Sequence, residues 1–424
     1  MKIPSVKGTR DFYPPDMAVR NFIIDGWKRV SLRNGFQEYD GPIFEYLKMF
    51  QIKSGEEIAE QLFSLKDRGG RELALRPEIT PTLARMVNQQ INSLPKPIKW
   101  FSVPRLCRAE RPQKGRLREF FQWNVDIIGV DDVLADAETI FCAIDYLKEV
   151  GLTPDDIVVK ISSRKMLAAV LQAIGIAESK LDALYAVLDK RSKLPDEAFE
   201  EMLEKQLPDT AKRQKVLELM NAESIKEIES MFGRQEAFDE LVNLMTWLNR
   251  MGVGDYYRFD PGIVRGLAYY TGIVYEIYDK ASELRAIGGG GRYDDLLKQF
   301  GGPDIPATGF GIGDCILGIL LEEKGLLKPN ARELDYFVAY VKKDYKGRAI
   351  ELAVELRSRG YIADFSYKAG KLGKQLKQAS ERNAKQCIII GEEFNNNQLV
   401  VKDMATGKQE LVNVDEFLQQ PRSF

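Results

Sequence analysis

Two kinds of side chain alternate between residues 116 and 127, and this alternation constrains the fold more than any other feature of the 424-residue chain. The polar and aromatic set is Arg116, Arg118, Phe120, Gln122, Asn124 and Asp126. The intervening set is apolar except for Glu119, and its members are Leu117, Phe121, Trp123, Val125 and Ile127. Because successive side chains of a strand point to opposite faces, residues 117–129 are predicted to form a β-strand with one face in the core.

The other face of this strand has two interpretations. It is either the solvated outer face of an antiparallel sheet or a sheet surface that faces a ligand. A second strand-like run covers residues 98–108, and the loop between the two runs is strongly basic. Its cations are Arg108, Arg111, Lys114, Arg116 and Arg118, interrupted by Pro112 and Gly115. Guanidinium groups bind phosphates bidentately and Phe120 could stack on a flat base, so the ligand-facing interpretation predicts a nucleotide site.

The regions around these strands mix helix and strand patterns. Helices are predicted at residues 16–33, with Asp16 as N-cap, at 80–90 and at 134–150. Strands are predicted at residues 36–45, with a break at Pro42, and at 62–78, which should form a hairpin around Gly69 and Gly70. A further strand is predicted at 263–279. Residues 283–297 and 309–325 are each predicted to begin as a strand and to lead into a helix. This combination predicts a β-rich core.

Two further regions differ from this core. Residues 160–252 are predicted to be helical, because apolar residues recur at helical spacing. The clearest stripe ends at Gly252 and contains Phe238, Leu241, Leu244, Met245 and Leu248. After a linker at 324–335, strand and helix patterns alternate, which predicts a small α/β domain of about 90 residues.

Charge and composition exclude several classes of function. The chain has 61 Lys and Arg against 63 Asp and Glu, so any basic site must be local. It contains no histidine, which excludes histidine-based catalysis and most zinc enzymes. The four cysteines are widely spaced, so neither a zinc site nor a disulfide framework is expected. Without a secretory signal or an apolar run of about 18 residues, we expect a cytosolic protein that does not enter membranes.

Three segments carry candidate ligand-binding residues, and each has a purely structural alternative. Arg265, followed by Tyr269 and Tyr270, either faces a ligand or is a surface residue of a core strand. Residues 288–295, GGGGRYDD, fit neither common phosphate-loop motif, and they give either backbone clearance over a ligand or a tight turn. Glu78 is either a pocket carboxylate or an acid that favours the first turn of a helix.

Five segments, in this order and spacing, resemble those of the histidyl-tRNA synthetases. They are KGTRDFYPPD, LALRPEITPTLAR, CRAERPQKGRLREFFQWNVDIIG, VRGLAYYTGIVYE and GGGGRYDDLL, and the resemblance covers nearly the whole chain. It implies an α+β fold, namely the class II synthetase antiparallel sheet flanked by helices, with an all-helical insertion and a C-terminal α/β anticodon-binding domain. The implied boundaries are 1–158 and 255–328 for the catalytic core, 159–254 for the insertion and 333–424 for the anticodon-binding domain.

The resemblance also implies a role for individual residues. In the ATP site, Arg108 matches the arginine that binds the α-phosphate, and Arg116 lies near the nucleotide. Glu110 matches the carboxylate near the adenine amine, and Phe120 matches the ring on which adenine stacks. The loop tip, with Arg111, Gln113 and Lys114, matches the part that meets the tRNA acceptor end. The matching histidine pocket contains Glu78, Thr80, Gln122, Asp126, Tyr269, Tyr270 and Tyr293, and Arg265 matches the catalytic arginine of this family.

The implied reaction is ligation of L-histidine to tRNA(His), with ATP and Mg²⁺ as cofactors and no metal site built from protein side chains alone. The histidine carboxylate attacks the α-phosphorus, and fixed Arg donors and Mg²⁺ stabilise the developing negative charge. No general base is needed, so an enzyme without histidine can perform this step. The family also implies a homodimer, with Pro42 in the interface motif. The lack of histidine is either drift or an adaptation that spares the enzyme's own synthesis during histidine starvation.

Two positions depart from the family pattern. Ala268 stands where most members carry an acid, and Ile316 stands where an arginine normally enters the helix of the third class II motif. Two other functions therefore remain as alternatives: a synthetase-like regulatory subunit of ATP phosphoribosyltransferase, and a tRNA- or partner-binding module without catalysis. The retained pocket residues and the anticodon-type domain favour the ligase.

Overall fold

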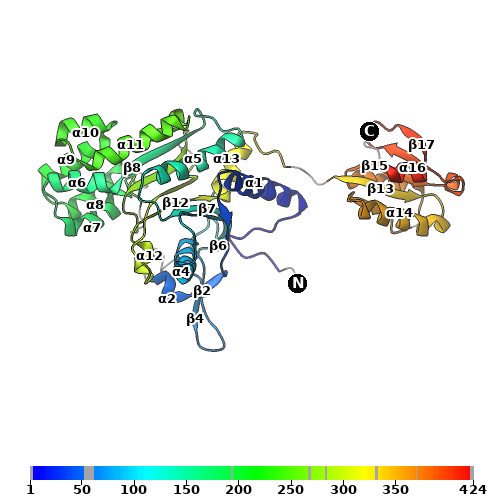
Figure 1. The fold of residues 1–424 in the computed structure, drawn as a ribbon, viewed down its shortest axis with the longest axis horizontal. Helices are drawn as coiled ribbons and strands as arrows, with labels where there is room; N and C mark the ends of the chain where they lie inside the picture. The colour runs from blue at the N-terminus through cyan, green and yellow to red at the C-terminus, as the bar shows by residue number, and fades with distance from the viewer. Residues whose placement is uncertain are drawn as a thin grey trace. The chain divides into compact units, whose positions relative to one another are not determined.

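The chain forms two compact units, Met1–Pro329 and Asn330–Phe424, in a computed structural model (Figure 1). The structure describes residues 3–51, 62–191, 194–265, 269–281, 284–329, 333–368 and 370–420. Each unit has a sheet and a hydrophobic core of its own. None of the helices within these ranges is long and apolar enough to cross a membrane.

The first unit is built on a nine-stranded sheet. Its order is β1 (Gln37–Glu38), β5 (Ile98–Ser102), β7 (Glu119–Ile128), β12 (Ala307–Gly313), β11 (Gly288–Arg292), β10 (Ile273–Asp279), β8 (Ile157–Ser163) and β9 (Tyr257–Phe259), with β6 (Arg105–Cys107) also paired to β7. All pairs are antiparallel except β1 with β5 and β8 with β9, at the two edges. The predicted antiparallel sheet is therefore confirmed.

The two faces of β7 pack against different cores. Its apolar residues, such as Trp123, join the main cluster with helices α1 (Pro14–Arg33), α5 (Leu134–Glu149) and α13 (Asp314–Glu323). These three helices lie together along the sheet in Figure 1. The opposite face is covered by a second cluster, which includes α4 (Thr80–Gln90) and α12 (Leu296–Gln299). Asn124 and Asp126 are only 5% and 4% exposed, so the interpretation of this face as solvated is wrong.

A small three-stranded sheet adjoins α4 in the order β2 (Phe44–Tyr46), β4 (Glu72–Leu75) and β3 (Ser64–Lys66). Helix α2 (Leu47–Gln51) follows β2. The predicted hairpin is present as β3 and β4, and Gly70 turns with a positive φ of 78°. The break at Pro42 is also confirmed, because the chain passes from the main sheet at Glu38 to the small sheet at Phe44.

The helical region begins at Arg164 rather than at residue 160, because residues 157–163 form strand β8. Its α-helices are α6 (Arg164–Ala173), α7 (Leu181–Leu188), α8 (Asp196–Gln206), α9 (Thr210–Asn221), α10 (Ile225–Phe232) and α11 (Ala237–Arg250). The predicted stripe on α11 is buried except for the half-buried Met245, and Gly252 follows the helix with a φ of 73°. Helix α11 also packs on α5, which ties this region to the main sheet.

Two local predictions are wrong. Asp16 is not the N-cap of the first helix, which begins at Pro14; its carboxylate instead accepts the Tyr13 N–H at 3.1 Å from inside the first turn. The strand predicted at 263–279 begins only at Ile273. Arg265 has a φ of 58°, in the left-handed region, which interrupts an extended backbone. Residues 266–268, including the departure at Ala268, lie outside the described ranges.

The second unit confirms the predicted alternation of strands and helices. Its sheet has the order β14 (Ala363–Phe365), β13 (Leu334–Tyr340), β15 (Ala384–Ile390), β16 (Gln398–Asp403) and β17 (Gln409–Asn413). The first three strands are parallel, and the last two are antiparallel to their neighbours. Helices α14 (Lys346–Ser358), α15 (Leu372–Glu381) and α16 (Val414–Gln419) complete the unit, and apolar clusters cover both faces of its sheet.

Candidate active site

The base of the candidate site is a patch of four paired glycines on β11 and β12, which we call the glycine floor. Gly289 pairs with Gly311, and Gly291 pairs with Gly309. A Cβ atom at Gly309 would lie 2.3 Å from Asp126 Oδ1, and one at Gly311 would lie 2.9 Å from the Gln122 amide. The GGGG segment is therefore a strand and not a tight turn, and its lack of side chains leaves room for pocket residues.

Arg265 lies across the same floor, where a Cβ at Gly289 would be 2.3 Å from its Nη1 atom. Its guanidinium donates to Glu276 at 3.2 Å and to the Tyr270 hydroxyl at 3.4 Å. Burial alone would lower the pKa of Arg265, but the neighbouring Tyr270 and Glu276 raise it, so the group stays charged. Arg164 holds the Arg265 carbonyl at 2.6 Å, which fixes the left-handed backbone. Arg265 is thus a fixed cation in the site, and the surface-residue interpretation is wrong.

Asp126, on β7, is a buried carboxylate beside the glycine floor. The Tyr293 hydroxyl donates to its Oδ1 atom, whereas Oδ2 is buried and has no hydrogen-bond partner in the described part of the chain. Burial raises the pKa of Asp126 to about 7, and the Tyr293 hydrogen bond opposes the rise. Such a carboxylate is poised to accept a hydrogen bond from a ligand donor, because its burial with one partner is otherwise unfavourable.

Glu78 is a second buried carboxylate at the same site. It accepts from the Tyr269 hydroxyl at 3.4 Å, and the Tyr269 ring packs against Tyr293 with centroids 5.8 Å apart. Burial raises the pKa of Glu78, while the charge of Arg108 lowers it. Thr80, half-buried, opens the helix that follows. Tyr269 and Tyr293 thus connect Glu78 to Asp126.

The basic loop begins at the edge of this pocket. Arg108 donates its Nε–H to the Pro77 carbonyl at 3.0 Å, and its guanidinium lies 5.1 Å from the centre of the Phe120 ring. Glu110 and Arg116 form an ion pair with each other, and Arg118 donates to the Glu110 carbonyl at 3.1 Å. A cation and a flat ring therefore lie together at the mouth of the pocket, a combination suited to a nucleotide.

The tip of the loop is exposed. Arg111, Gln113 and Lys114 face solvent, and Lys114 forms an ion pair with Glu323 of α13 at 3.2 Å. Gly115 turns the tip with a φ of 73°. The structure therefore separates the tip from Arg108, which lies at the pocket.

Three comparisons with known proteins agree on the family. The family model for histidyl-tRNA synthetase matches residues 8–313, and that for the anticodon binding domain matches residues 335–421. The chain belongs to the histidyl-tRNA synthetase family. Among curated relatives, the chloroplastic/mitochondrial histidine–tRNA ligase of Arabidopsis thaliana is 40% identical over 97% of this chain and 85% of its own length. The histidine–tRNA ligase of Opitutus terrae is 39% identical over 99% and 98%.

Solved structures of the family show the same fold. Histidyl-tRNA synthetase from Nostoc sp. PCC 7120 matches with a TM-score of 0.82 at 24% identity, over 100% of both chains. The apo S. aureus histidyl-tRNA synthetase matches with a TM-score of 0.75 at 26% identity, over 99% of both. A Bacillus halodurans structure titled as an ATP phosphoribosyltransferase regulatory subunit/histidyl-tRNA synthetase has a TM-score of 0.75 at 26% identity, over 92% of this chain and 99% of its own.

Ile316, the departure from the family's third motif, has a packing role in this chain. It lies in the first turn of α13 and is 8% exposed. A Cβ atom at Gly115 would lie 2.1 Å from its Cδ1 atom, so the loop tip rests directly on this side chain. An apolar contact between loop and helix thus occupies the position where the resemblance led us to expect an arginine.

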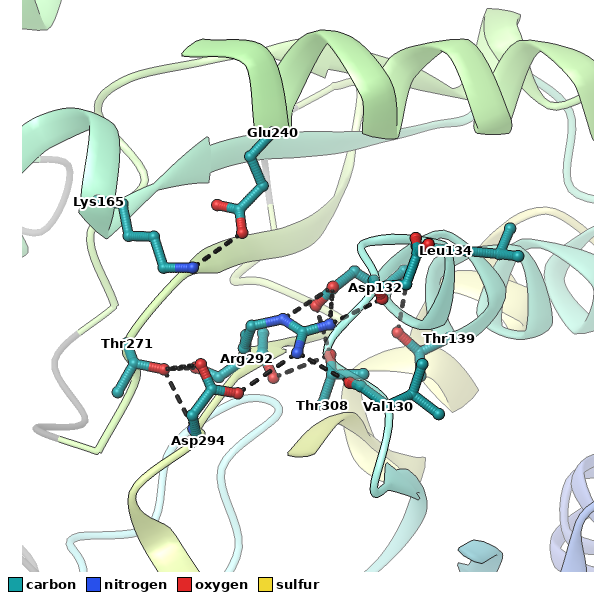
Figure 2. Close-up of polar contacts among 12 residues, drawn as sticks. Val130, Asp132, Leu134, Thr139, Lys165, Glu240, Thr271, Arg292, Asp294 and Thr308 are labelled. Carbon is teal, nitrogen blue, oxygen red and sulfur yellow. Dashed lines mark hydrogen bonds and ion pairs between the residues drawn. The ribbon is translucent and has the colours of Figure 1, made fainter. Parts of the chain in front are cut away.

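A buried polar network joins the end of β11 to α5 and β12 (Figure 2). Arg292 is 1% exposed and donates to the fully buried Asp136 of α5, with Nε 3.0 Å from the carboxylate. Thr308 of β12 donates to the same carboxylate at 2.7 Å, and Arg292 also pairs with Asp294 at 3.3 Å. Because Tyr293 lies between Arg292 and Asp294, this network fixes the strand segment that carries the Asp126 partner.

The sequence pattern did not single out several residues at the site. Asp136 carried no signal, since it resembles any acid at the start of a helix, and Arg292 was hidden within the glycine run. Glu276 gives an acidic exception inside an apolar strand, which could have drawn attention to it. Tyr39 lies in the second cluster with Tyr269 and Tyr293, although nothing in its surroundings along the chain marks it.

The described residues contain no group of three or more cysteine or acidic side chains that could hold a metal ion. Arg108 and Phe120 fit a nucleotide, and Mg²⁺ commonly binds in proteins together with substrate phosphates.

Proposed function

We propose that this chain is an ATP-dependent histidine–tRNA ligase. The observation that carries the proposal is the unpartnered carboxylate oxygen of Asp126, which lies on the glycine floor shared with Arg265. A buried acceptor without a partner beside a fixed cation suits an amino acid that has a ring N–H at one end and a carboxylate at the other. Membership of the histidyl-tRNA synthetase family supports the same assignment.

In this proposal the two carboxylates bind opposite ends of the amino acid. Asp126 accepts the imidazole N–H, and Glu78, with Thr80 beside it, binds the α-amino group. Tyr269, Tyr270 and Tyr293 form an aromatic wall. Gln122 lies on the same face of β7 as Asp126, two same-face positions away, and its amide lies against Gly311 of the glycine floor.

ATP binds at the mouth of the pocket. Arg108 contacts the α-phosphate, and Phe120 stacks on adenine. Glu110 and Arg116 pair with each other in the structure. With ATP bound, Glu110 faces the adenine amine and Arg116 the nucleotide. Bound Mg²⁺, carried on the phosphates, supplies positive charge that offsets the negative charge of the triphosphate.

The chemistry of the first step needs no general base. The histidine carboxylate is already a nucleophile; it attacks the α-phosphorus, and pyrophosphate leaves with its electron pair. Arg265 and Arg108 donate to the oxygens on which charge develops, and they need little reorganisation because the structure holds Arg265 through Glu276, Tyr270 and Arg164. The chain's lack of histidine is therefore no obstacle to adenylate formation.

The exposed loop tip and the second unit serve tRNA(His). Arg111, Gln113 and Lys114 meet the acceptor end, and residues 333–424 bind the anticodon. We expect removal of 333–424 to leave much of the adenylation and to abolish most charging of tRNA. Because the second unit has its own core, truncation should leave the first unit folded. Equal loss of both activities would contradict this assignment.

A second copy of the chain completes the enzyme. The apolar side chains Ile43, Phe44, Tyr46 and Leu65 are exposed on or beside the small sheet next to Pro42. Such a group on a protein surface is typical of an interface. Light scattering should give a dimer, and replacing Phe44 with Lys should shift the mass towards a monomer, whereas Met231→Lys, at an exposed site on α10, should not.

The experiment that tests the function is ATP–pyrophosphate exchange with each of the twenty amino acids. We expect exchange with histidine alone. Exchange with none would favour a synthetase-like regulatory subunit, and exchange with another amino acid would refute the assignment of the pocket.

A further inference from the structure

Two buried polar atoms in the pocket have no hydrogen-bond partner among the described residues. One is Asp126 Oδ2, and the other is the hydroxyl of Tyr39. Tyr39 is 8% exposed, so its hydroxyl is cut off from bulk water. A buried donor without a partner is unfavourable, and in a ligand-binding site such a group points to a contact made by the ligand.

The backbone places Tyr39 at the same end of the pocket as Asp126. Its N–H donates to the Phe101 carbonyl at 2.9 Å, which aligns it with β5 just beyond β1. Its ring packs against Trp100, with centroids 5.5 Å apart. Trp100 is the direct cross-strand partner of Asp126. Tyr39, Trp100 and Asp126 thus follow one another across the sheet.

Electrostatics agrees with this placement. Burial raises the pKa of Tyr39 well above its usual value, and the charge of Asp126 raises it further. The hydroxyl therefore stays protonated and is available as a donor. Since Tyr293 already donates to Oδ1 of Asp126, the pocket offers one free acceptor and one free donor at this end.

A neutral imidazole requires that pair of groups. One ring nitrogen carries a proton and donates, and the other is an acceptor. We propose that Tyr39 is a specificity-determining residue whose hydroxyl donates to the unprotonated ring nitrogen of histidine, while Asp126 Oδ2 accepts from the protonated one. This inference rests on the proposed function. It adds Tyr39 as a residue that favours the neutral imidazole by binding its unprotonated nitrogen.

The test combines a variant with two histidine analogues. Pyrrol-2-ylalanine and pyrrol-3-ylalanine each keep one ring N–H and replace the other nitrogen with C–H. Dissociation constants for wild type and Tyr39→Phe are measured by inhibition of histidine-dependent exchange and by calorimetry. Wild type should prefer histidine to the better pyrrole by about tenfold, the scale of one buried hydrogen bond. Tyr39→Phe should weaken histidine binding by about tenfold and leave that pyrrole unchanged.

Tyr146→Phe is the matched control. The Tyr146 hydroxyl is also buried without a partner in the described structure, but it lies in the main core against Trp27 and Trp123. Its removal should leave both dissociation constants unchanged. Thermal unfolding of both variants reports on the fold, and the wild-type preference is a separate measurement that needs no variant.

The outcomes separate the two proposals. If Tyr39→Phe weakens histidine and pyrrole equally, or if wild type shows no preference, Tyr39 only packs and the inference is wrong while the ligase function stands. If wild type neither binds histidine nor exchanges pyrophosphate with it, the proposed function fails, and the inference with it.

Discussion

The histidine end of the site and the basic loop are built in opposite ways. At the proposed histidine end, Asp126 and Glu78 are buried and Arg265 is 17% exposed, and the base under Asp126 and Arg265 is backbone alone. In the loop, cations are paired with the protein's own acids on or near the surface, as Lys114 is with Glu323. The first region is preorganised for a ligand, whereas the second must exchange its internal partners for ligand groups.

This difference predicts how each region responds to change. Replacing a buried, fixed group should reduce binding or activity strongly, because no other group replaces the missing donor or acceptor. Exposed ion pairs contribute about 0–1 kcal/mol and are screened by salt, so changes there should be graded. Four experiments can break or sharpen the contrast, beginning with the largest expected effect.

Arg265→Ala should reduce the rate of adenylate formation by more than about 10²-fold, the scale for loss of one preorganised donor at developing charge. Histidine binding should change far less. Single-turnover formation of the adenylate is the measurement, and Arg258→Ala, an exposed arginine on β9, is the control. An unchanged rate would show that Arg265 serves only to hold Tyr270 and Glu276.

Asp126→Asn should change how stability depends on pH. The folded-state pKa of Asp126 is about 7, above its usual 3.8, so its contribution to stability is fully present below about pH 4 and is lost as pH rises through 7. The variant should therefore match wild type near pH 4 and become more stable than wild type as pH rises, by roughly 4 kcal/mol at pH 8. Thermal unfolding of the ligand-free proteins at both pH values measures this.

The comparison of wild type with Asp126→Asn isolates one group. Asp136 also has a raised pKa, of about 6, because it is buried, but it is present in both proteins and cancels in the difference. Parallel pH profiles for the two proteins would mean that Asp126 is solvated and that the pocket is less enclosed than described.

Gly311→Ala should raise the KM for histidine by about tenfold, because the added methyl displaces the Gln122 side chain at 2.9 Å. The KM for ATP should change little. Gly313→Ala, two residues along the same strand with no atom within 4 Å of the added carbon, is the matched control. If both variants behave alike, the glycine floor has no role in shaping the pocket.

Lys114→Ala should have the smallest effect. Adenylation should be spared, the KM for tRNA should rise a few-fold, and the slope of its salt dependence should fall by about one phosphate contact. Glu323→Gln, which removes the ion-pair partner, should lower that KM or leave it unchanged. A drop in pyrophosphate exchange equal to the drop in charging would show that the tip serves ATP.

Local sequence patterns predicted those helices, strands and turns whose own residues are spaced according to their burial. The hairpin around Gly70, helix α4 and the alternation along β7 all follow from spacing within one segment. The covering of the polar face of β7 could not be read in this way, because it depends on α4 and on Tyr293, which lie far along the chain.

Local sequence patterns were limited in the same way at the candidate site, because its residues come from distant parts of the chain. Family motifs indicated Asp126, Glu78 and Arg265. In the structure Asp126 and Arg265 lie at the glycine floor, and Tyr269 contacts both Glu78 and Tyr293. The contact between Arg292 and Asp136 joins residues 156 positions apart, and no periodicity reports such a pair. The strand predicted across Arg265 failed because long-range contacts, including one from Arg164, hold its backbone in a left-handed conformation.

The glycine floor limits how this pocket can be redesigned. Engineers who change the amino acid that an enzyme accepts usually enlarge or reduce the side chains that surround it. At the floor there is no side chain to reduce, and any substitution adds bulk against Asp126, Gln122 or Arg265. New substrates would have to be sought through Tyr39, Tyr269 and Tyr293, so the choice of ring would change while the reacting end stays as it is.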